Sequence, residues 1–239
     1  MTERVHGLPG TNGRRRLYLM RHGQVSYFDS DGRAVNPDLV ELTDAGRAQA
    51  QAMATLLAEI EFDRVGWTGL LRTRQTAELV LAGRAALPLE ELPRFREIRP
   101  GVLRGLARDR LEAEYAYGLE RAAEADASFA GGDLYADFYG RVTSALEALL
   151  LEPGWSRMLL VAHDAVNRAL LAWTANAGLA GLAAFEQDPG CLNILDADVL
   201  DGRIVRKLIK ALNVTPASYV KRGNYLTSFE QVFFSRRRR

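Results

Sequence analysis

Two short and strongly apolar runs in this chain each lead within two residues to a histidine. Leu17–Met20 is followed by Arg21 and His22, and Met158–Ala162 is followed directly by His163. Apolar runs of this length, bounded by charged or polar residues, are typical of strands buried in a parallel sheet. Ligands of such sheets bind beyond the carboxyl ends of the strands. We therefore expect both histidines to lie at one edge of a sheet.

Segments with helical periodicity alternate with the predicted strands. Thr43 can cap a helix whose apolar stripe runs to Ile60, and Asp133 can cap a longer helix after two glycines. The other predicted elements are a strand over Val65–Thr68, helices over Arg72–Ala82 and after His163, and closing strands over Cys191–Leu195 and Ile204–Leu212 joined through Asp201-Gly202.

This alternation predicts an α/β fold, a three-layer α/β/α sandwich with a mostly parallel central sheet and helices on both faces. Residues 102–130 are rich in Ala, Glu, Arg and Tyr and predict a small helical cap insertion. We expect residues 1–16 to form a flexible lead-in, residues 17–235 to form one domain that includes the cap, and residues 236–239 to form a basic tail.

Composition narrows the classes of partner. The 31 Lys and Arg residues nearly balance the 30 Asp and Glu residues, and a net charge of +1 argues against nucleic acid or an anionic membrane as the main partner. The single cysteine, Cys191, can form no internal disulfide. Without a long apolar run or an apolar N-terminal stretch, we expect a cytoplasmic protein. Only three histidines are present, and His6 lies in the lead-in.

Several sequence blocks, taken in order, resemble the histidine phosphatase (phosphoglycerate mutase-like) superfamily. A lone Arg-His-Gly triplet is a weak signal, but an ordered series of blocks is a strong one. The matching blocks are residues 17–24 (LYLMRHGQ), 42–50 (LTDAGRAQA), 70–78 (LLRTRQTAE), 96–98 with Gly101, 131–133 with Asp137-Phe138, and 159–163 (LLVAH).

The resemblance implies phosphoryl transfer through five side chains. It implies His22 as the nucleophile, Arg21 and Arg72 as a clamp on the phosphoryl oxygens, His163 as a further donor to those oxygens, and Glu97 as the general acid and base. The residue chemistry agrees, because planar guanidinium groups match phosphate geometry and a carboxyl group can protonate a leaving oxygen.

Some roles have competitors. Arg74 competes with Arg72 for the phosphate, and Glu97 could be a solvated carboxylate between Arg96 and Arg99. Asp164 stands where the family commonly has Gly; it is a second candidate acid, although it can equally cap the helix that follows.

Other residues are candidates for binding. Gln24, Ser26 and Asp164 could contact phosphate or line the pocket, whereas Val25 and Phe28 replace the hydroxylated residue and the Asn usual in the family. In the cap, the candidates for substrate contacts are Arg104, Arg108, Arg110, Tyr115 and Tyr117.

These residues predict a phosphomonoesterase that acts on a small phosphorylated metabolite through phosphohistidine. A cofactor-dependent phosphoglycerate mutase would share the same residues, and a non-catalytic phospho-ligand binding module is a third possibility. We expect no cofactor and no metal, because an arginine beside the nucleophile would repel a cation. Dimers are common in the superfamily, which makes a homodimer a candidate assembly.

Overall fold

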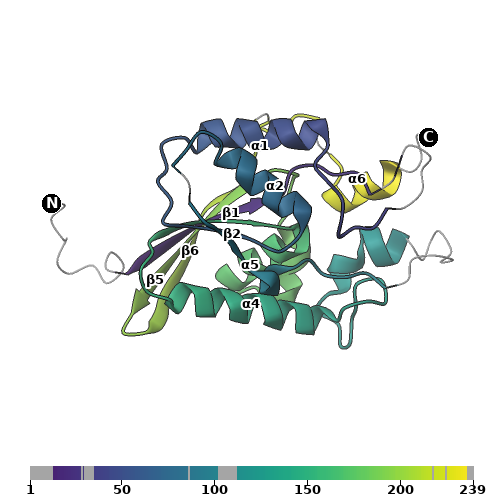
Figure 1. Cartoon of the computed structure of the whole chain (residues 1–239). Helices are drawn as coiled ribbons and strands as arrows, with labels where there is room; N and C mark the ends of the chain where they lie inside the picture. Colours follow the sequence, from purple (N-terminus) through teal and green to yellow (C-terminus); the bar gives the residue numbers. More distant parts are fainter. Residues whose placement is uncertain are drawn as a thin grey trace.

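In the computed structural model, the described residues are 13–27, 29, 35–85, 87–101, 112–216, 218–223 and 225–235. They form a six-stranded sheet between two layers of helices (Figure 1). The predicted α/β sandwich is therefore confirmed. His6, Phe28, Arg104, Arg108, Arg110 and the tail 236–239 lie outside the described residues.

The sheet has the strand order β3-β2-β4-β1-β5-β6. The first four strands in this order are parallel, and β5 and β6 continue the sheet as an antiparallel hairpin. Asp201 and Gly202 form the turn with positive φ angles of 49° and 71°, as the sequence predicted. The strands are β1 (Arg14–Arg21), β2 (Arg64–Trp67), β3 (Leu89–Glu91), β4 (Arg157–Ala162), β5 (Leu192–Leu200) and β6 (Arg203–Val214).

Strand β1 begins earlier than predicted. Residues 14–16, expected in the lead-in, already belong to the strand because two of their arginines pair with carboxylates on β5. Arg14 Nε lies 2.7 Å from Asp198 Oδ1, and Arg16 Nε lies 2.7 Å from Asp196 Oδ1. Cross-strand charge pairs of this kind extend a ladder beyond the apolar run that a sequence reader sees.

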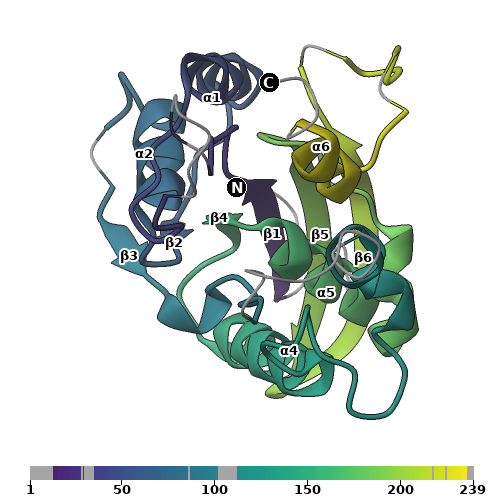
Figure 2. The same ribbon diagram turned by 90° about the vertical axis from the view of Figure 1, so that its right-hand side faces the viewer.

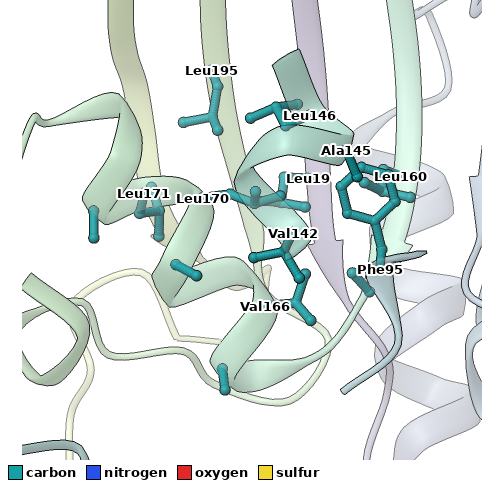
Figure 3. Packing of buried hydrophobic residues seen from close by; sticks show 14 of the residues in the cluster. Leu19, Phe95, Val142, Ala145, Leu146, Leu160, Val166, Leu170, Leu171 and Leu195 are labelled. Carbon is teal, nitrogen blue, oxygen red and sulfur yellow. The ribbon is translucent and has the colours of Figure 1, made fainter. Parts of the chain in front are cut away.

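Alternate residues of β1 face opposite helical layers. Leu17 and Leu19 pack with α4 and α5, whereas Tyr18 and Met20 pack with α1 and α2. Figure 3 shows Leu19 in the first of these two clusters, among side chains of α4, α5 and the neighbouring strands. The helices are α1 (Asp44–Leu56), α2 (Leu71–Val80), α4 (Tyr135–Leu151), α5 (Asp164–Thr174) and α6 (Ser228–Ser235).

The two predicted helix caps had different outcomes. Thr43 caps α1, and its hydroxyl accepts a hydrogen bond from the backbone N–H of Gly46 at 3.1 Å. The prediction for Asp133 was wrong: α4 begins at Tyr135, and Asp133 instead accepts a hydrogen bond from the backbone N–H of Arg99 at 3.0 Å. That bond ties the start of α4 to the loop that follows Glu97.

The described part of the cap consists of short turns. A π-helical turn η2 (Glu112–Ala116) and a 3-10 turn η3 (Gly118–Arg121) stand where a helical insertion was predicted. Other 3-10 turns are η1 (Pro93–Phe95) and η4 (Gly178–Ala184). Among the described residues, no helix is both long and apolar enough to cross a membrane.

Candidate active site

The two histidines meet at the carboxyl edge of the parallel strands, as predicted. Strands β1 and β4 pair in register with Arg21 opposite Ala162, so His22 and His163 leave adjacent strand ends together. Their ring centroids are 5.3 Å apart. Figure 2 looks onto this edge of the sheet, with α2, α5 and α6 around it.

The imidazole of His22 is held in a defined orientation. Its Nδ1 lies 2.7 Å from the carbonyl oxygen of Gly23, and its Nε2 lies 3.1 Å from Nε of Arg72. A carbonyl can only accept, so Nδ1 carries the proton; a guanidinium can only donate, so Nε2 presents its lone pair. Burial, with the charges of Arg72 and Arg21, lowers the pKa of His22 well below 6.5. The ring is therefore neutral and nucleophilic at Nε2.

Arg72 enters the site from the first turn of α2, and Arg74 does not. Arg72 is 3% exposed, and its Nη1 donates to the carbonyl oxygen of Pro37 at 2.7 Å. The side chain of Arg74 is 55% exposed and pairs with Glu78 on the outer face of the helix. Of the two competing arginines, only Arg72 therefore faces the histidines.

His163 is buried between Arg72 and Thr68. Nη2 of Arg72 lies 3.4 Å from its Nδ1, and the hydroxyl of Thr68 lies 2.7 Å from its Nε2. Burial, with the charges of Arg72 and His22, lowers the pKa of His163 well below 6.5. Sequence reasoning missed Thr68 as a site residue, although it was placed at the end of a predicted strand.

Arg21 faces the same space and has one donor to spare. Its Nη1 donates to the carbonyl oxygen of Gln187 at 2.5 Å and lies 2.7 Å from Asp164 Oδ2. Its buried Nε has no hydrogen-bond partner within the part of the chain that the structure describes. A buried donor without a partner is costly, so this atom favours a ligand that accepts a hydrogen bond.

Glu97 is held at the start of α5, where the charges of Asp164 and Arg72 act on it. Its two carboxylate oxygens accept hydrogen bonds from the backbone N–H groups of Ile98 at 3.1 Å and Ala165 at 3.2 Å. Burial and the negative charge of Asp164 raise the pKa of Glu97 to about 7. Such a carboxyl group can both release and accept a proton near neutral pH.

Both carboxylate oxygens of Asp164, the competing acid, have partners. Its Oδ2 meets Arg21 and the hydroxyl of Ser228, and its Oδ1 accepts from Arg168. Burial alone would raise the pKa of Asp164, but the charges of Arg21 and Arg168 outweigh burial and lower it. The first residue of α5 is Asp164 itself, and no side-chain cap bond forms at the start of this helix.

Gln24 and Ser26 were predicted to contact phosphate or line the pocket, and both are exposed. The side-chain oxygen of Gln24 accepts a hydrogen bond from the hydroxyl of Thr43 at 3.1 Å, which ties it to the start of α1. In the cap, Tyr115 is half-buried against Phe129, with ring centroids 5.4 Å apart, and burial raises its pKa.

The described residues offer no set of three or more His, Cys, Asp and Glu side chains that could hold a metal ion. The site instead combines donors, a neutral nucleophile and a carboxyl group. That arrangement suits the transfer of an anionic group from an alcohol.

Comparison with known proteins agrees with the family resemblance of the sequence blocks. The family model for the histidine phosphatase superfamily (branch 1) matches residues 17–209. An adenosylcobalamin/alpha-ribazole phosphatase of Salmonella typhimurium is 31% identical over 189 residues, which cover 76% of this chain and 90% of that one. A 2-carboxy-D-arabinitol-1-phosphatase of Triticum aestivum is 30% identical over 215 residues. That match covers 88% of this chain, which spans only 43% of the length of the wheat protein.

Solved structures agree with these sequence matches. The alpha-ribazole phosphatase of Shigella flexneri superposes with a TM-score of 0.66 at 27% identity, over 83% of this chain and 96% of that one. A mycobacterial glucosyl-3-phosphoglycerate phosphatase superposes with a TM-score of 0.68 at 26% identity, over 84% of this chain and 99% of that one.

Proposed function

Because the chain belongs to the histidine phosphatase superfamily (branch 1), we propose that it hydrolyses a small phosphorylated metabolite through a phosphohistidine at His22. The observation that carries the proposal is the orientation of His22, whose Nε2 lone pair faces the buried guanidinium of Arg72 while the charge of Arg21 also acts on the ring. A module that only bound phosphate would need the guanidinium groups but neither an oriented nucleophile nor a carboxyl group poised near neutral pH.

In the first step the enzyme takes up the phosphoryl group. The spare Nε of Arg21 and the donors of Arg72 bind the phosphoryl oxygens, and Nε2 of His22 attacks phosphorus. The bond from phosphorus to the alcohol oxygen breaks as the bond from Nε2 to phosphorus forms. Glu97 gives its proton to the leaving oxygen, so the product departs as an alcohol and Glu97 becomes a carboxylate.

In the second step water releases the phosphate. The Glu97 carboxylate takes a proton from water, and the water oxygen attacks the phosphorus of phosphohistidine. The bond from Nε2 to phosphorus breaks, inorganic phosphate forms, and Glu97 is protonated again for the next cycle. The hydrogen bond from Nδ1 of His22 to Gly23 holds the ring through both steps.

His163 would donate to a phosphoryl oxygen from Nδ1, and Thr68 controls whether it can. In the free site Nδ1 faces a guanidinium donor, so the ring proton is on Nε2 and points to the hydroxyl of Thr68. When the phosphate draws Arg72 away, Nε2 can release its proton to solvent while Nδ1 takes one up, and the Thr68 hydroxyl then turns and donates to Nε2. The N–H at Nδ1 faces the phosphate.

The substrate would be a small phosphomonoester. The relatives are an adenosylcobalamin/alpha-ribazole phosphatase, a 2-carboxy-D-arabinitol-1-phosphatase and a glucosyl-3-phosphoglycerate phosphatase, so their names have only phosphatase activity in common. We further propose that the protein is cytoplasmic, since its single cysteine is buried and unpaired. We also propose that it forms a homodimer, because dimers are common in the superfamily. Cell fractionation and light scattering test these two points.

The test is hydrolysis of a panel of phosphomonoesters combined with trapping of an acid-labile phosphoryl label. We expect phosphate release and a label in the unaltered protein, and loss of both in His22→Ala. Arg74→Ala is the matched surface control and should keep both. Rapid isomerisation of 3-phosphoglycerate without phosphate release would make the protein a mutase. No label and no hydrolysis across the panel would leave only a binding module.

A further inference from the structure

A chain of buried charges connects Arg21 to the C-terminal helix. Asp164 is 4% exposed and Arg168 is 2% exposed, and their side chains meet at 2.5 Å. Asp164 also lies 2.7 Å from Arg21, and Arg168 lies 2.5 Å from Glu186. These two arginines and two carboxylates sum to zero charge, which lets the group be buried.

Helix α6 closes this network through its first residue. The hydroxyl of Ser228 donates to Asp164 Oδ2 at 2.5 Å, and its backbone N–H donates to Glu186 Oε1 at 2.8 Å. Ser228 is 4% exposed. The next residue, Phe229, packs on Tyr115 of the cap with ring centroids 5.5 Å apart. Figure 1 shows α6 at this end of the molecule, beside the cap turns.

We propose that Asp164 is a positioning residue that sets the guanidinium of Arg21 for the phosphate, and that Ser228 makes helix α6 part of the phosphate site. The inference rests on the proposed function for its catalytic meaning. It assigns a role to the C-terminal segment, which lies beyond the matched region 17–209.

The geometry around Arg21 supports this assignment. Its Nη1 is fixed from two sides, by Asp164 and by the carbonyl oxygen of Gln187, while its Nε stays without a partner among the described residues. Fixing one end of a planar guanidinium fixes the direction of its other donors. Since both oxygens of Asp164 accept hydrogen bonds and its pKa is lowered, it acts as an anchor and not as a proton donor.

The charge of Asp164 also acts on Glu97, and this gives a readout that loss of packing would not produce. Its negative charge raises the pKa of Glu97, so Asp164→Asn should move the basic limb of the kcat/KM profile to lower pH. The other ionisable groups whose charge acts on Glu97 or responds to it are Arg21, Tyr27, Arg72, Tyr115 and Arg141.

The experiment compares Ser228→Ala with Thr227→Ala in the full chain. Both changes remove one hydroxyl at the start of α6. Thr227 is exposed, however, and its hydroxyl accepts a hydrogen bond from the backbone N–H of Glu230, within the helix itself. The dissociation constant of inorganic phosphate is measured by calorimetry, and kcat/KM is measured for a phosphomonoester. We expect Ser228→Ala to weaken phosphate binding about 2- to 12-fold, the range for one lost hydrogen bond, and Thr227→Ala to change it less than about twofold.

The outcomes separate the inference from the proposed function. If the unaltered protein hydrolyses phosphomonoesters and Ser228→Ala binds phosphate like Thr227→Ala, the inference is overturned and the function stands. If no phosphomonoester is hydrolysed, the function fails, and the phosphate titrations still decide whether Ser228 supports the site. If Asp164→Asn does not fold because Arg21 loses its carboxylate partner and Arg168 loses one of its two, the Ser228 comparison decides alone.

Discussion

Replacement of Glu97 by Gln should impair catalysis and remove a loss of stability that the unaltered protein shows as the pH rises. With a pKa of about 7, about half of the Glu97 carboxyl groups are protonated at pH 7, whereas at the ordinary value of 4.5 only about one in 300 would be. The site therefore raises the population of the acid form by about 150-fold. Glutamine keeps the shape of the side chain but can neither give nor take this proton.

The catalytic effect depends on the leaving group. For an alkyl phosphate, whose alkoxide must be protonated as it leaves, kcat/KM should fall by about 10² to 10⁴ in Glu97→Gln. For 4-nitrophenyl phosphate, whose phenolate leaves without a proton, it should fall less than about tenfold. In the unaltered protein, kcat/KM for the alkyl phosphate should decline about tenfold per pH unit above pH 7.

The effect of Glu97 on folding stability follows from its raised pKa. The pKa of Glu97 is higher in the folded state than in the unfolded state, so its contribution to stability is complete below pH 4.5 and is lost as the pH rises through about 7. Above that pH the ionised carboxylate costs the folded protein up to about 3 kcal/mol, a ceiling because the side chain keeps some contact with solvent. Urea unfolding should therefore show a larger drop in the free energy of unfolding between pH 5 and pH 8 for the unaltered protein than for Glu97→Gln. The comparison is made across pH because the amide nitrogen of Gln cannot accept one of the two backbone hydrogen bonds of Glu97 at any pH.

Glu61→Gln is the control for both measurements, because the side chain of Glu61 is 89% exposed. Equal losses for the two substrates in Glu97→Gln, together with an unchanged pH profile, would refute the assignment of Glu97 as the acid. An equal drop in the free energy of unfolding between pH 5 and pH 8 in the two proteins would refute the raised pKa of Glu97.

Three further substitutions test the site and its frame. Arg72→Ala should lower kcat/KM by about 10²- to 10³-fold, because it removes a charged donor from the transferring group, while Arg74→Ala should stay within about twofold in the same steady-state assay. Phe138→Ala should lower the free energy of unfolding by about 3 to 5 kcal/mol in urea titrations, since the ring is 1% exposed in the core; a loss below about 1 kcal/mol would contradict that packing. Gly46→Ala would place a Cβ 2.2 Å from the carbonyl oxygen of Gln24, so it should reduce both thermal stability and activity, and a variant with unchanged melting and kcat would contradict this close approach.

The sequence predicted those parts of the site that depend on local patterns. The apolar runs before His22 and His163 placed both rings at strand ends, and the resemblance of residues 70–78 to the family implied Arg72 as the phosphate ligand. The parts it missed depend on contacts between distant segments. Arg168 and Ser228 are 60 residues apart in the chain, and no local pattern marks them as partners.

The wrong prediction for Asp133 and the unused capping alternative for Asp164 have the same physical origin. Both residues are good helix caps by type, yet the carboxylate of Asp133 is bound by the backbone of Arg99, and that of Asp164 by Arg21 of β1 and by Arg168 within α5. Tertiary hydrogen bonds outweigh a capping preference of about 1 kcal/mol.

Strand β3 was not predicted, since three residues carry too little periodicity to recognise.

The central position of β1 sets when this site can form during synthesis. The strand is made before both of its neighbours, since it pairs with β4 from Arg16 opposite Arg157 and with β5 from Arg14 opposite Asp198. While the ribosome is still producing the helices between them, the strand that carries the nucleophile has neither neighbour. Such long-range pairing slows folding and leaves an apolar strand open to association. We therefore expect nascent chains that end before β4 to depend on chaperones.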